Sequence, residues 1–391
     1  MKNICFVSLG ELLVTKGGVH RVTYCLMNEL GKLGYHCLYL FYNMDASAYY
    51  TDNVEDENHK LLPIQVEDYL NRQKVDVIIY QQAITSAAFP KLVSEFQQHR
   101  FKCISVFHNS PCIYEKTFTP SRVWYNFWHQ SGIFNKISNL GRLLVYPLWK
   151  RRVIRNTGKM FAKSYDISDK CVMLSANEYP ILSRYLSRNV TDKCVTIHNP
   201  LTFNFIETEE CLKHKEKKVL IVSRLNNFEK RLDRALRIWK MVESVGITDW
   251  HLYIVGWGLQ EKMLHDLAKK LKLKNVHFEG RQPSEPYYYE ASIFMMTSAI
   301  EGWGLTLTES MQNGVVPIVF DSYPALADII TNDYDGFIIP NDDIEAYGKM
   351  LINLIQNKKL RERIAQNGLV SCQRFKMNKI VKKWVNLIEN L

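Results

Sequence analysis

Short apolar segments alternate with amphipathic helical segments along most of this chain, in two successive series. The first series predicts strands at 4–9, 37–42, 75–80, 103–107 and 170–174, with helical patterns such as 20–33 and 90–99 between them. Strands that alternate with helices form parallel sheets with crossover helices. The first half is therefore expected to be a doubly wound α/β domain.

A second series of the same kind follows a break in the pattern. Strands are predicted at 219–222, 251–255, 276–279, 293–296, 317–320 and 336–339, with helices at 231–244, 261–271 and 344–356. The break at 199–217 is a proline followed by a polar run, and 391 residues are too many for one ordinary core. We expect two domains, 1–200 and 201–375.

The last segment, 376–391, reads as an amphipathic helix. Its apolar residues recur three and four positions apart, so one face needs an apolar partner. We assign this helix to the first domain.

The net charge of +10 is concentrated in one segment. Residues 110–165 hold ten basic residues and one acid, Glu115, together with eleven aromatic residues. Three interpretations are open: a solvated helical insertion, a nucleic-acid surface of basic and aromatic residues, or a surface for anionic membranes. We favour the membrane.

Cysteines and hydropathy indicate the compartment. The nine cysteines form no C-x-x-C pair, and Cys5, Cys37 and Cys103 lie in or beside apolar runs, as in proteins of a reducing environment. Residues 1–14 read as a first strand and not as a signal peptide, and no apolar run reaches the ~20 residues that span a bilayer. We expect a cytoplasmic protein, either soluble or peripheral on the inner face of the plasma membrane.

Two carboxylates, Glu301 and Glu309, lie eight positions apart across a turn that contains Gly304. The apolar run 293–296 precedes them and a helical pattern begins at Leu305, which predicts a strand, a loop and a helix. The loop amides and the helix N-terminus favour an anion at one spot. A diphosphate would fit there, with one carboxylate facing a sugar and the other a ribose.

Two cations follow the first strand of the second half. Arg224 comes directly after that strand, and Lys230 stands six residues later, before the predicted helix 231–244. Ligands of doubly wound sheets gather at the carboxyl ends of the strands. Both cations are therefore placed where a ligand would bind.

With these motifs the chain resembles the GT-B glycosyltransferases of the family-4 type. These are retaining, nucleotide-sugar-dependent enzymes of bacterial capsule, exopolysaccharide and lipid-glycan assembly. The resemblance is strongest over 219–340 and leaves 112–169 unspecified. It implies two Rossmann-like domains that face a cleft, with the C-terminal helix crossing back to the first domain.

The resemblance also implies a catalytic set. Arg224 and Lys230 would hold the donor diphosphate and stabilise the charge that develops when the glycosyl–phosphate bond breaks. Glu301 would bind hydroxyls of the donor sugar. His108, at the end of strand 103–107, would position and polarise without acting as a general base.

Further residues would bind the nucleotide sugar. Glu309 would hold the ribose, the amides of Gly304 and Leu305 would meet the diphosphate, and the Gly17-Gly18 loop would let backbone approach a phosphate or sugar. The full expected set is Gly17, Gly18, Arg224, Lys230, Gly256, Arg281, Glu301, Gly304, Leu305 and Glu309. Residues 321–324 depart from the family pattern, which often has two glycines there.

These expectations describe a glycosyltransferase that transfers a sugar from a nucleotide sugar to a glycan or a polyprenyl-diphosphate-linked acceptor. For the donor, a UDP-sugar is favoured over a GDP-sugar. No metal and no cofactor are expected, and no nucleic acid. Two alternatives stay open: a nucleotide-sugar hydrolase or epimerase on the same fold, and a non-catalytic protein that binds nucleic acid or nucleotide sugars.

Overall fold

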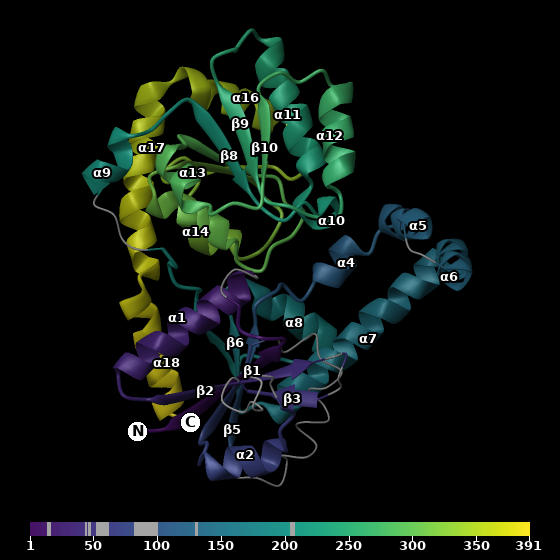
Figure 1. Cartoon of the computed structure of the whole chain (residues 1–391), viewed down its shortest axis with the longest axis vertical. Helices are drawn as coiled ribbons and strands as arrows, with labels where there is room; N and C mark the ends of the chain where they lie inside the picture. Colours follow the sequence, from purple (N-terminus) through teal and green to yellow (C-terminus); the bar gives the residue numbers. More distant parts are fainter. Residues whose placement is uncertain are drawn as a thin grey trace. The chain divides into compact units, whose positions relative to one another are not determined.

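The computed structural model describes residues 1–13, 17–43, 45, 48–51, 62–81, 101–129, 132–203 and 208–391 (Figure 1). The predicted helix at 90–99 lies outside these residues. The chain divides into two compact units. Unit 1 comprises Met1–Glu115, Leu140–Thr202 and Met377–Leu391, and unit 2 comprises Lys116–Asn139 and Phe203–Lys376.

Unit 1 contains a seven-stranded sheet in the order β3-β2-β1-β4-β5-β6-β7. All neighbouring strands are parallel except β2 and β3. The strands are β1 (Asn3–Leu9), β2 (His36–Asn43), β3 (Ala48–Tyr50), β4 (Val77–Tyr80), β5 (Lys102–Phe107), β6 (Lys170–Met173) and β7 (Cys194–Thr196). The helices within the unit are α1 (Gly18–Lys32), α2 (Val66–Arg72), α7 (Tyr146–Ile167), α8 (Tyr179–Leu186) and α18 (Met377–Glu389).

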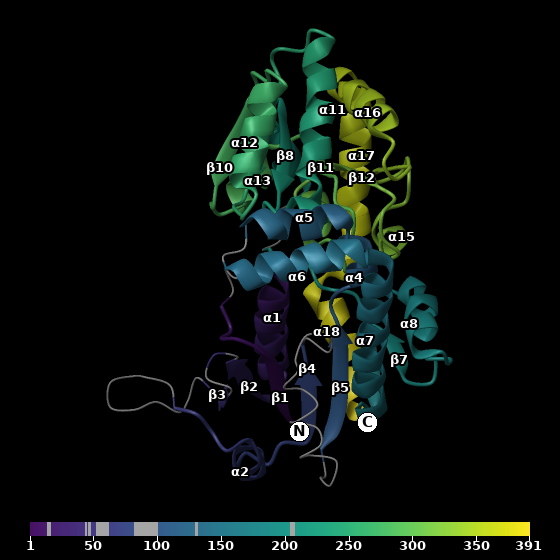
Figure 2. The same cartoon turned by 90° about the vertical axis from the view of Figure 1, so that its right-hand side faces the viewer.

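Alternation along the strands places a core on both faces of this sheet. Ile4 and Phe6 of β1 pack with α1 and α18 on one face, whereas Cys5 and Val7 pack with α2 on the other. The amphipathic C-terminal segment is thus the helix α18, and it lies beside α1 in both views (Figures 1 and 2). Its apolar face completes the core of unit 1.

Unit 2 contains a six-stranded parallel sheet in the order β10-β9-β8-β11-β12-β13. Its strands are β8 (Lys218–Val222), β9 (His251–Val255), β10 (Val276–Gly280), β11 (Ile293–Met296), β12 (Val316–Phe320) and β13 (Phe337–Ile339). Its helices are α5 (Pro120–His129), α9 (Thr208–Lys213), α10 (Asn227–Lys230), α11 (Leu232–Ser244), α12 (Glu261–Lys270), α13 (Glu285–Glu290), α14 (Leu305–Gln312), α15 (Leu326–Ile329), α16 (Ile344–Gln356) and α17 (Lys358–Ser371).

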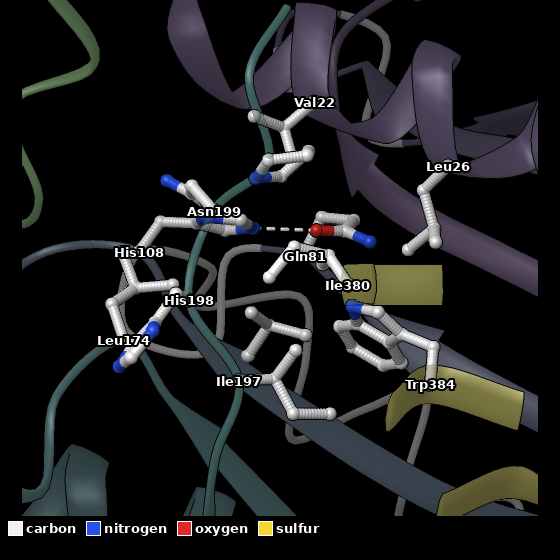
Figure 3. A pocket seen from close by; sticks show the side chains of 12 residues that line it. Val22, Leu26, Gln81, His108, Leu174, Ile197, His198, Asn199, Ile380 and Trp384 are labelled. Carbon is white, nitrogen blue, oxygen red and sulfur yellow. Dashed lines mark hydrogen bonds between the residues drawn. The ribbon is translucent and has the colours of Figure 1, made fainter. Parts of the chain in front are cut away.

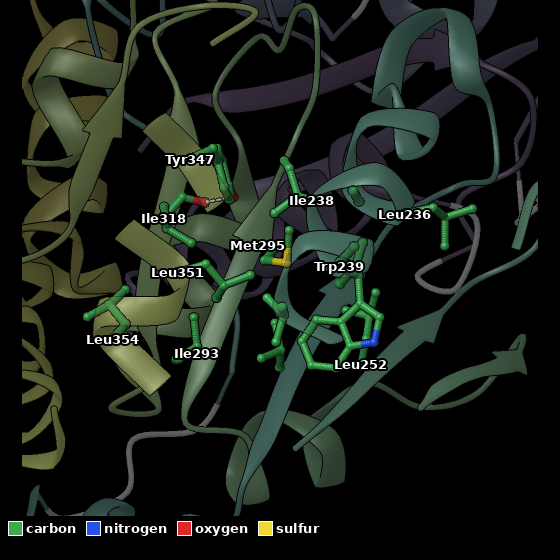
Figure 4. Packing of buried hydrophobic residues seen from close by; sticks show 14 of the residues in the cluster. Leu236, Ile238, Trp239, Leu252, Ile293, Met295, Ile318, Tyr347, Leu351 and Leu354 are labelled. Carbon is green, nitrogen blue, oxygen red and sulfur yellow. Dashed lines mark hydrogen bonds between the residues drawn. The ribbon is translucent and has the colours of Figure 1, made fainter. Parts of the chain in front are cut away.

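The core of unit 2 explains why its strands read as unbroken apolar runs. Both faces of a parallel sheet are covered by helices, so β11 and β12 are buried at every position. Trp239 of α11 and Tyr347 of α16 are fully buried in the hydrophobic cluster that includes residues of these strands (Figure 4). The Tyr347 hydroxyl donates a hydrogen bond of 2.6 Å to the carbonyl oxygen of Ile318.

The basic segment forms helices, and it is divided between the units. Helices α4 (Ile113–Thr117) and α6 (Ile133–Leu144) each cross a division, and α5 belongs to unit 2. The sequence division at 200/201 and 375/376 lies within two residues of the observed divisions at 202/203 and 376/377. The predicted and observed divisions differ for residues 116–139. The sequence pattern assigns them to the first domain, whereas in the structure they belong to unit 2.

Strands β3 and β7 and helix α17 are not predicted by the sequence pattern. Both strands have only three residues, too few for a period of two to be distinguished from chance. Helix α17 begins with three basic residues among its first four, so its first turn has no apolar face. Asn357 caps it by accepting a hydrogen bond of 3.0 Å from the Leu360 amide.

Candidate functional site

Lys230 and Glu301 form an ion pair at the edge of the unit 2 sheet where the parallel strands end. The Lys230 ammonium lies 2.6 and 2.8 Å from the two carboxylate oxygens of Glu301, and both side chains are largely buried. Ser298 donates a further hydrogen bond of 2.6 Å to Glu301 Oε1. Both oxygens of this carboxylate therefore have donors before any ligand binds.

Local structure sets the direction of Lys230. The predicted helix 231–244 agrees with α11 to within one residue, whereas the short helix α10 before it was not predicted. Arg231, with φ +49°, separates the two helices. Lys230 is the last residue of α10, and its carbonyl accepts a hydrogen bond of 3.1 Å from the Thr297 hydroxyl. The turn after β8 is thereby tied to the turn after β11, and the two charges meet.

Arg224 stands apart from this pair. Its side chain is 71% exposed and lies 3.2 Å from the carboxylate of Glu229. An exposed pair of this kind contributes at most about 1 kcal/mol, so the guanidinium can exchange its partner for an anion at little cost. Of these two side chains, Lys230 is held in place by its ion pair, whereas Arg224 is exposed and can change its partner.

Gly304 begins helix α14 in a left-handed conformation. Its φ is +85°, and a Cβ there would lie 2.7 Å from the Tyr323 hydroxyl oxygen. Leu305 is the first helical residue, and amides in the first turn have no partner within a helix. The turn therefore suits an anion through its backbone.

Glu309 lies one helical turn further along α14 and is 1% exposed. Its carboxylate is 3.2 Å from the Tyr288 hydroxyl, which also lies 3.3 Å from the carbonyl oxygen of Thr306. The two glutamates thus have different surroundings: Glu301 contacts a cation and Glu309 contacts a phenol.

The turns after β8, β9 and β10 are joined through Gly256. Its φ is +142°, and a Cβ at this position would lie 1.8 Å from the Ser223 carbonyl oxygen. Its amide donates a hydrogen bond of 2.7 Å to the carbonyl oxygen of Gly280. Arg281 follows directly and lies over the exposed ring of Trp257 at 5.9 Å.

His108, Gly17 and Gly18 belong to unit 1. His108 follows β5, and its ring Nε2 lies 2.5 Å from the Gln81 side-chain oxygen. The ring lines a small cavity together with Leu26, Trp384 and other residues, as Figure 3 shows. Burial lowers the pKa of His108 to about 4, so the ring is neutral near pH 7.

The glycine loop begins helix α1. Gly17 has φ +155° and its carbonyl oxygen accepts a hydrogen bond of 3.1 Å from the Arg21 amide, while a Cβ there would meet no atom within 4 Å. The loop therefore leaves open space beside its backbone.

Sequence reasoning did not identify three residues of the site: Ser298, Glu229 and Tyr323. Ser298 precedes Glu301 by three positions, a spacing that could have indicated a contact within one turn. Glu229 lies next to Lys230 in the sequence and five positions from Arg224, whereas Tyr323 is brought to the site by tertiary contacts alone. Among the described residues, no three His, Cys, Asp or Glu side chains are grouped so that they could hold a metal ion, and no metal ligands are assigned.

Comparison with known proteins relates most of unit 2 to a known family. Residues 203–370 match the model for glycosyl transferases group 1. An uncharacterized glycosyltransferase of Haemophilus influenzae is 28% identical over 266 residues, which are 66% of this chain and 73% of that protein.

A second relative is an alpha-1,4-N-acetyl-D-galactosaminyltransferase of Campylobacter jejuni, named for a GalNAc-GalNAc-diNAcBac-PP-undecaprenol substrate. It is 25% identical over 226 residues, which are 58% of this chain and 61% of that enzyme. This chain thus spans less than two thirds of the Campylobacter enzyme.

Among solved structures, the Anabaena protein HepE in complex with UDP and glucose aligns over the whole of both chains. The TM-score is 0.69 at 12% sequence identity, so the likeness concerns the fold. Two parallel sheets, a group 1 match over unit 2 and glycosyltransferase relatives agree with one another. The chain is a glycosyltransferase of the GT-B fold, with two Rossmann-like domains.

Proposed function

We propose that this enzyme transfers a sugar from a nucleotide diphosphate donor to a glycan or lipid-linked acceptor, with retention of the anomeric configuration, as the family-4 type does. The observation that carries the proposal is the Lys230–Glu301 pair, with a cation 2.6 Å from a carboxylate, in the unit that also contains the Gly304 turn. A cation and a set of free amides match a diphosphate. A carboxylate matches the hydroxyls of a sugar.

The proposed chemistry needs the two cations in different roles. When the glycosyl–phosphate bond breaks, both of its electrons go to the diphosphate oxygen. Lys230 meets that charge from a fixed position, Arg224 turns toward it from solvent, and the amides of Gly304 and Leu305 meet it from the helix N-terminus. The two cations and the amides supply the stabilisation that a metal would otherwise supply, so we propose metal-independent transfer.

Glu301 is proposed to bind donor hydroxyls and not to act as the nucleophile. Lys230 and Ser298 already donate to its oxygens, which lowers the electron density available for attack. The acceptor hydroxyl instead attacks from the face that the diphosphate leaves. Its proton passes to the departing phosphate oxygen, so atoms and charge balance.

The remaining site residues are proposed to bind the donor without taking part in bond exchange. Glu309 binds the ribose, Gly256 and Arg281 lie beside the nucleotide, and Gly17 and Gly18 admit the sugar. His108 positions and polarises as a neutral ring, because a pKa of about 4 makes it a weak base.

We propose UDP as the donor nucleotide and a polyprenyl-diphosphate glycan as the acceptor. The Anabaena protein of the same fold was solved with UDP and glucose, and the Campylobacter relative is named for a PP-undecaprenol substrate. Both observations favour a role in the assembly of a bacterial surface polysaccharide, for example a capsule.

The basic segment 110–165 is proposed to hold the enzyme at an anionic membrane surface. Helix α6 exposes Phe134, Ile137 and Leu144 along one face, and helix α7 follows with a run of basic residues, Lys150, Arg151, Arg152 and Arg155. Apolar side chains beside basic ones suit the boundary between acyl chains and anionic head groups. None of the described helices combines the length and apolar character needed to cross a bilayer.

We further propose a cytoplasmic site of action, on the inner face of the plasma membrane. All nine cysteines are free, and seven of them are buried. Free thiols persist in a reducing compartment.

The test is a transfer assay with UDP-sugars and lipid-linked acceptors, with product analysis by NMR. Lys230→Met and Glu301→Gln should each lower kcat/KM by about a hundredfold or more, because each removes a fixed interaction with developing or bound charge. Lys262→Met is the matched control, since Lys262 is 90% exposed and pairs only weakly with Asp266.

Three results would contradict the proposal. Full activity of Lys230→Met and Glu301→Gln would refute the site, and an inverted product would refute retention. Sugar release that does not depend on acceptor would favour the hydrolase.

A further inference from the structure

In the sequence, residues 116–139 lie between two parts of unit 1, but they belong to unit 2. Side chains from 116–139 contact three turns of that unit. The Lys116 ammonium donates a hydrogen bond to the carbonyl oxygen of Ser322, after β12. The Tyr125 hydroxyl donates one of 3.3 Å to the carbonyl oxygen of Leu259, after β9. The third contact goes to Phe228, after β8.

The contact with Phe228 comes from two side chains of α5. The rings of Tyr125 and Phe228 meet edge to face at 5.3 Å between centroids, and the Arg122 guanidinium lies 5.7 Å from the Phe228 ring centroid. Both arrangements are attractive, because a positive edge or a cation meets the negative face of a ring.

Helix α10 is tied to neighbouring turns by hydrogen bonds, such as the one of 2.7 Å that the Glu229 carbonyl oxygen accepts from the Ala299 amide. The ring contacts of α5 with Phe228 add to these bonds. Helix α10 has four residues, none of which is buried, and it ends at the left-handed Arg231. Asn226 caps its start by accepting a hydrogen bond of 3.2 Å from the Phe228 amide. The same four residues carry Lys230 and Glu229, which contact Glu301 and Arg224.

The other two turns also lie beside the proposed donor site. The turn that ends at Leu259 contains Gly256, which abuts Ser223 next to Arg224. Ser322 directly precedes Tyr323, whose hydroxyl lies under Gly304. The contacts of Lys116, Arg122 and Tyr125 therefore go to turns that would hold the diphosphate.

We propose that Lys116, Arg122 and Tyr125 are positioning residues for the donor site. They hold the turns after β8, β9 and β12 in the arrangement that binds a nucleoside diphosphate. Phe228 and Lys230 belong to the same short helix, so contacts with Phe228 also position Lys230. This inference rests on the proposed function of Lys230. It predicts that loss of the α5 contacts weakens donor binding while the chemical step of the bound donor changes little.

The experiment measures UDP affinity of the full chain by calorimetry, together with donor KM and kcat. Tyr125→Ala and Phe228→Ala should each weaken UDP binding by about tenfold and raise donor KM in proportion, with kcat within about twofold. Because both variants remove the ring contact between Tyr125 and Phe228, the loss in the double variant should be smaller than the sum of the two single losses. Tyr125→Phe keeps the ring contact and should retain most of the affinity.

Trp128→Ala is the matched control. Trp128 is also an aromatic residue of α5, but it is 59% exposed and packs on Trp124 and Phe127 of the same helix. Wild-type UDP affinity of Tyr125→Ala, or an equal loss in Trp128→Ala, would overturn the inference. Additive losses in the double variant would overturn it as well.

Lys230→Met separates this inference from the proposed function. If that variant binds UDP as the wild type does, the proposed diphosphate site is wrong. If it binds UDP weakly while Tyr125→Ala binds normally, only the positioning role is wrong.

Discussion

At the scale of single residues, Gly304 and Tyr323 show how closely the site is packed. Tyr323 is buried, and burial, with the nearby Glu301 carboxylate adding to it, raises the pKa of its hydroxyl well above the usual value. The neutral phenol fills the space that a side chain on Gly304 would need. The turn can therefore present its amides only while residue 304 is glycine.

Gly304→Ala should destabilise the protein and weaken UDP binding by about tenfold. A left-handed conformation costs an alanine about 1–2 kcal/mol, and the new methyl group must displace the Tyr323 hydroxyl. Thermal unfolding and UDP calorimetry measure the two effects.

Gly280→Ala is the control for Gly304→Ala. Gly280 has φ +67°, but a Cβ there meets no atom within 4 Å. It should share the backbone strain and keep UDP affinity. Equal affinities in the two variants would show that the contact with Tyr323 does not matter for binding.

His108 should make stability depend on pH. Its folded pKa of about 4 lies below the ordinary 6.5, so the unfolded chain binds more protons between these values. The stability that the neutral ring contributes is present above pH 6.5 and is lost as the pH falls toward 4. The free energy of unfolding lost by pH 5 is roughly 2 kcal/mol. Denaturant unfolding at pH 7.5 and pH 5 measures it.

His108→Gln should reduce that loss of stability between pH 7.5 and pH 5. His265→Gln is the control, because it replaces a half-exposed histidine of unit 2. An unchanged pH dependence in His108→Gln would contradict the buried, neutral ring.

At the scale of elements, α18 shows how a distant segment completes a core. Tyr35 donates a hydrogen bond to Glu389, and Trp384 and Ile388 pack with β1 and α1. The spacing of apolar residues was sufficient to predict an amphipathic helix, since that spacing is a local property of the sequence. Its contacts with α1 and β1 depend on residues more than 350 positions away.

Trp384→Ala should destabilise unit 1 by about 3–5 kcal/mol, because it removes a buried ring and leaves a cavity. Hydrogen exchange of β1 and α1 measures the local loss. Lys382→Ala changes an exposed residue of the same helix and should leave exchange unaltered. Normal protection in Trp384→Ala would mean that α18 is dispensable for this core.

The elements also show where prediction from sequence stops. Most strands of both sheets were predicted to within two residues, because buried parallel strands are continuous apolar runs. The short helix α10 was not predicted, because four residues are too few to show a helical period, and the left-handed Arg231 that separates it from α11 has no signature in residue type. That break is what places Lys230 beside Glu301.

At the scale of the whole molecule, the uneven charge is the main feature. Nine of the nineteen exposed large apolar residues, counted over the described part of the chain, belong to 110–165, the segment that also contains ten basic residues. Exposed apolar and basic side chains in one segment are unusual for a protein whose surface contacts only solvent. It supports the proposed membrane surface.

Replacement of Lys150, Arg151, Arg152 and Arg155 by Gln should weaken binding to vesicles of anionic lipid by up to about a thousandfold. Each basic residue near such a surface contributes about 1 kcal/mol. Co-sedimentation with anionic and with neutral vesicles measures the change, and catalysis with a soluble acceptor should persist.

Replacement of Lys269, Lys270, Lys272 and Lys274 is the control with an equal loss of charge at another surface. If both quadruple variants lose vesicle binding equally, net charge and not the basic segment is responsible. If neither loses it, the membrane surface lies elsewhere.

By itself, the sequence determined the two α/β series, the amphipathic C-terminal helix, the location of the excess charge and the types of residue at the strand ends. These are properties of local periodicity and composition. Tertiary structure alone decided that Lys230 contacts Glu301, that Tyr323 lies under Gly304, and that residues 116–139 join unit 2. Such contacts join residues up to about two hundred positions apart, and they depend on the register of packed strands and turns, which no local pattern specifies.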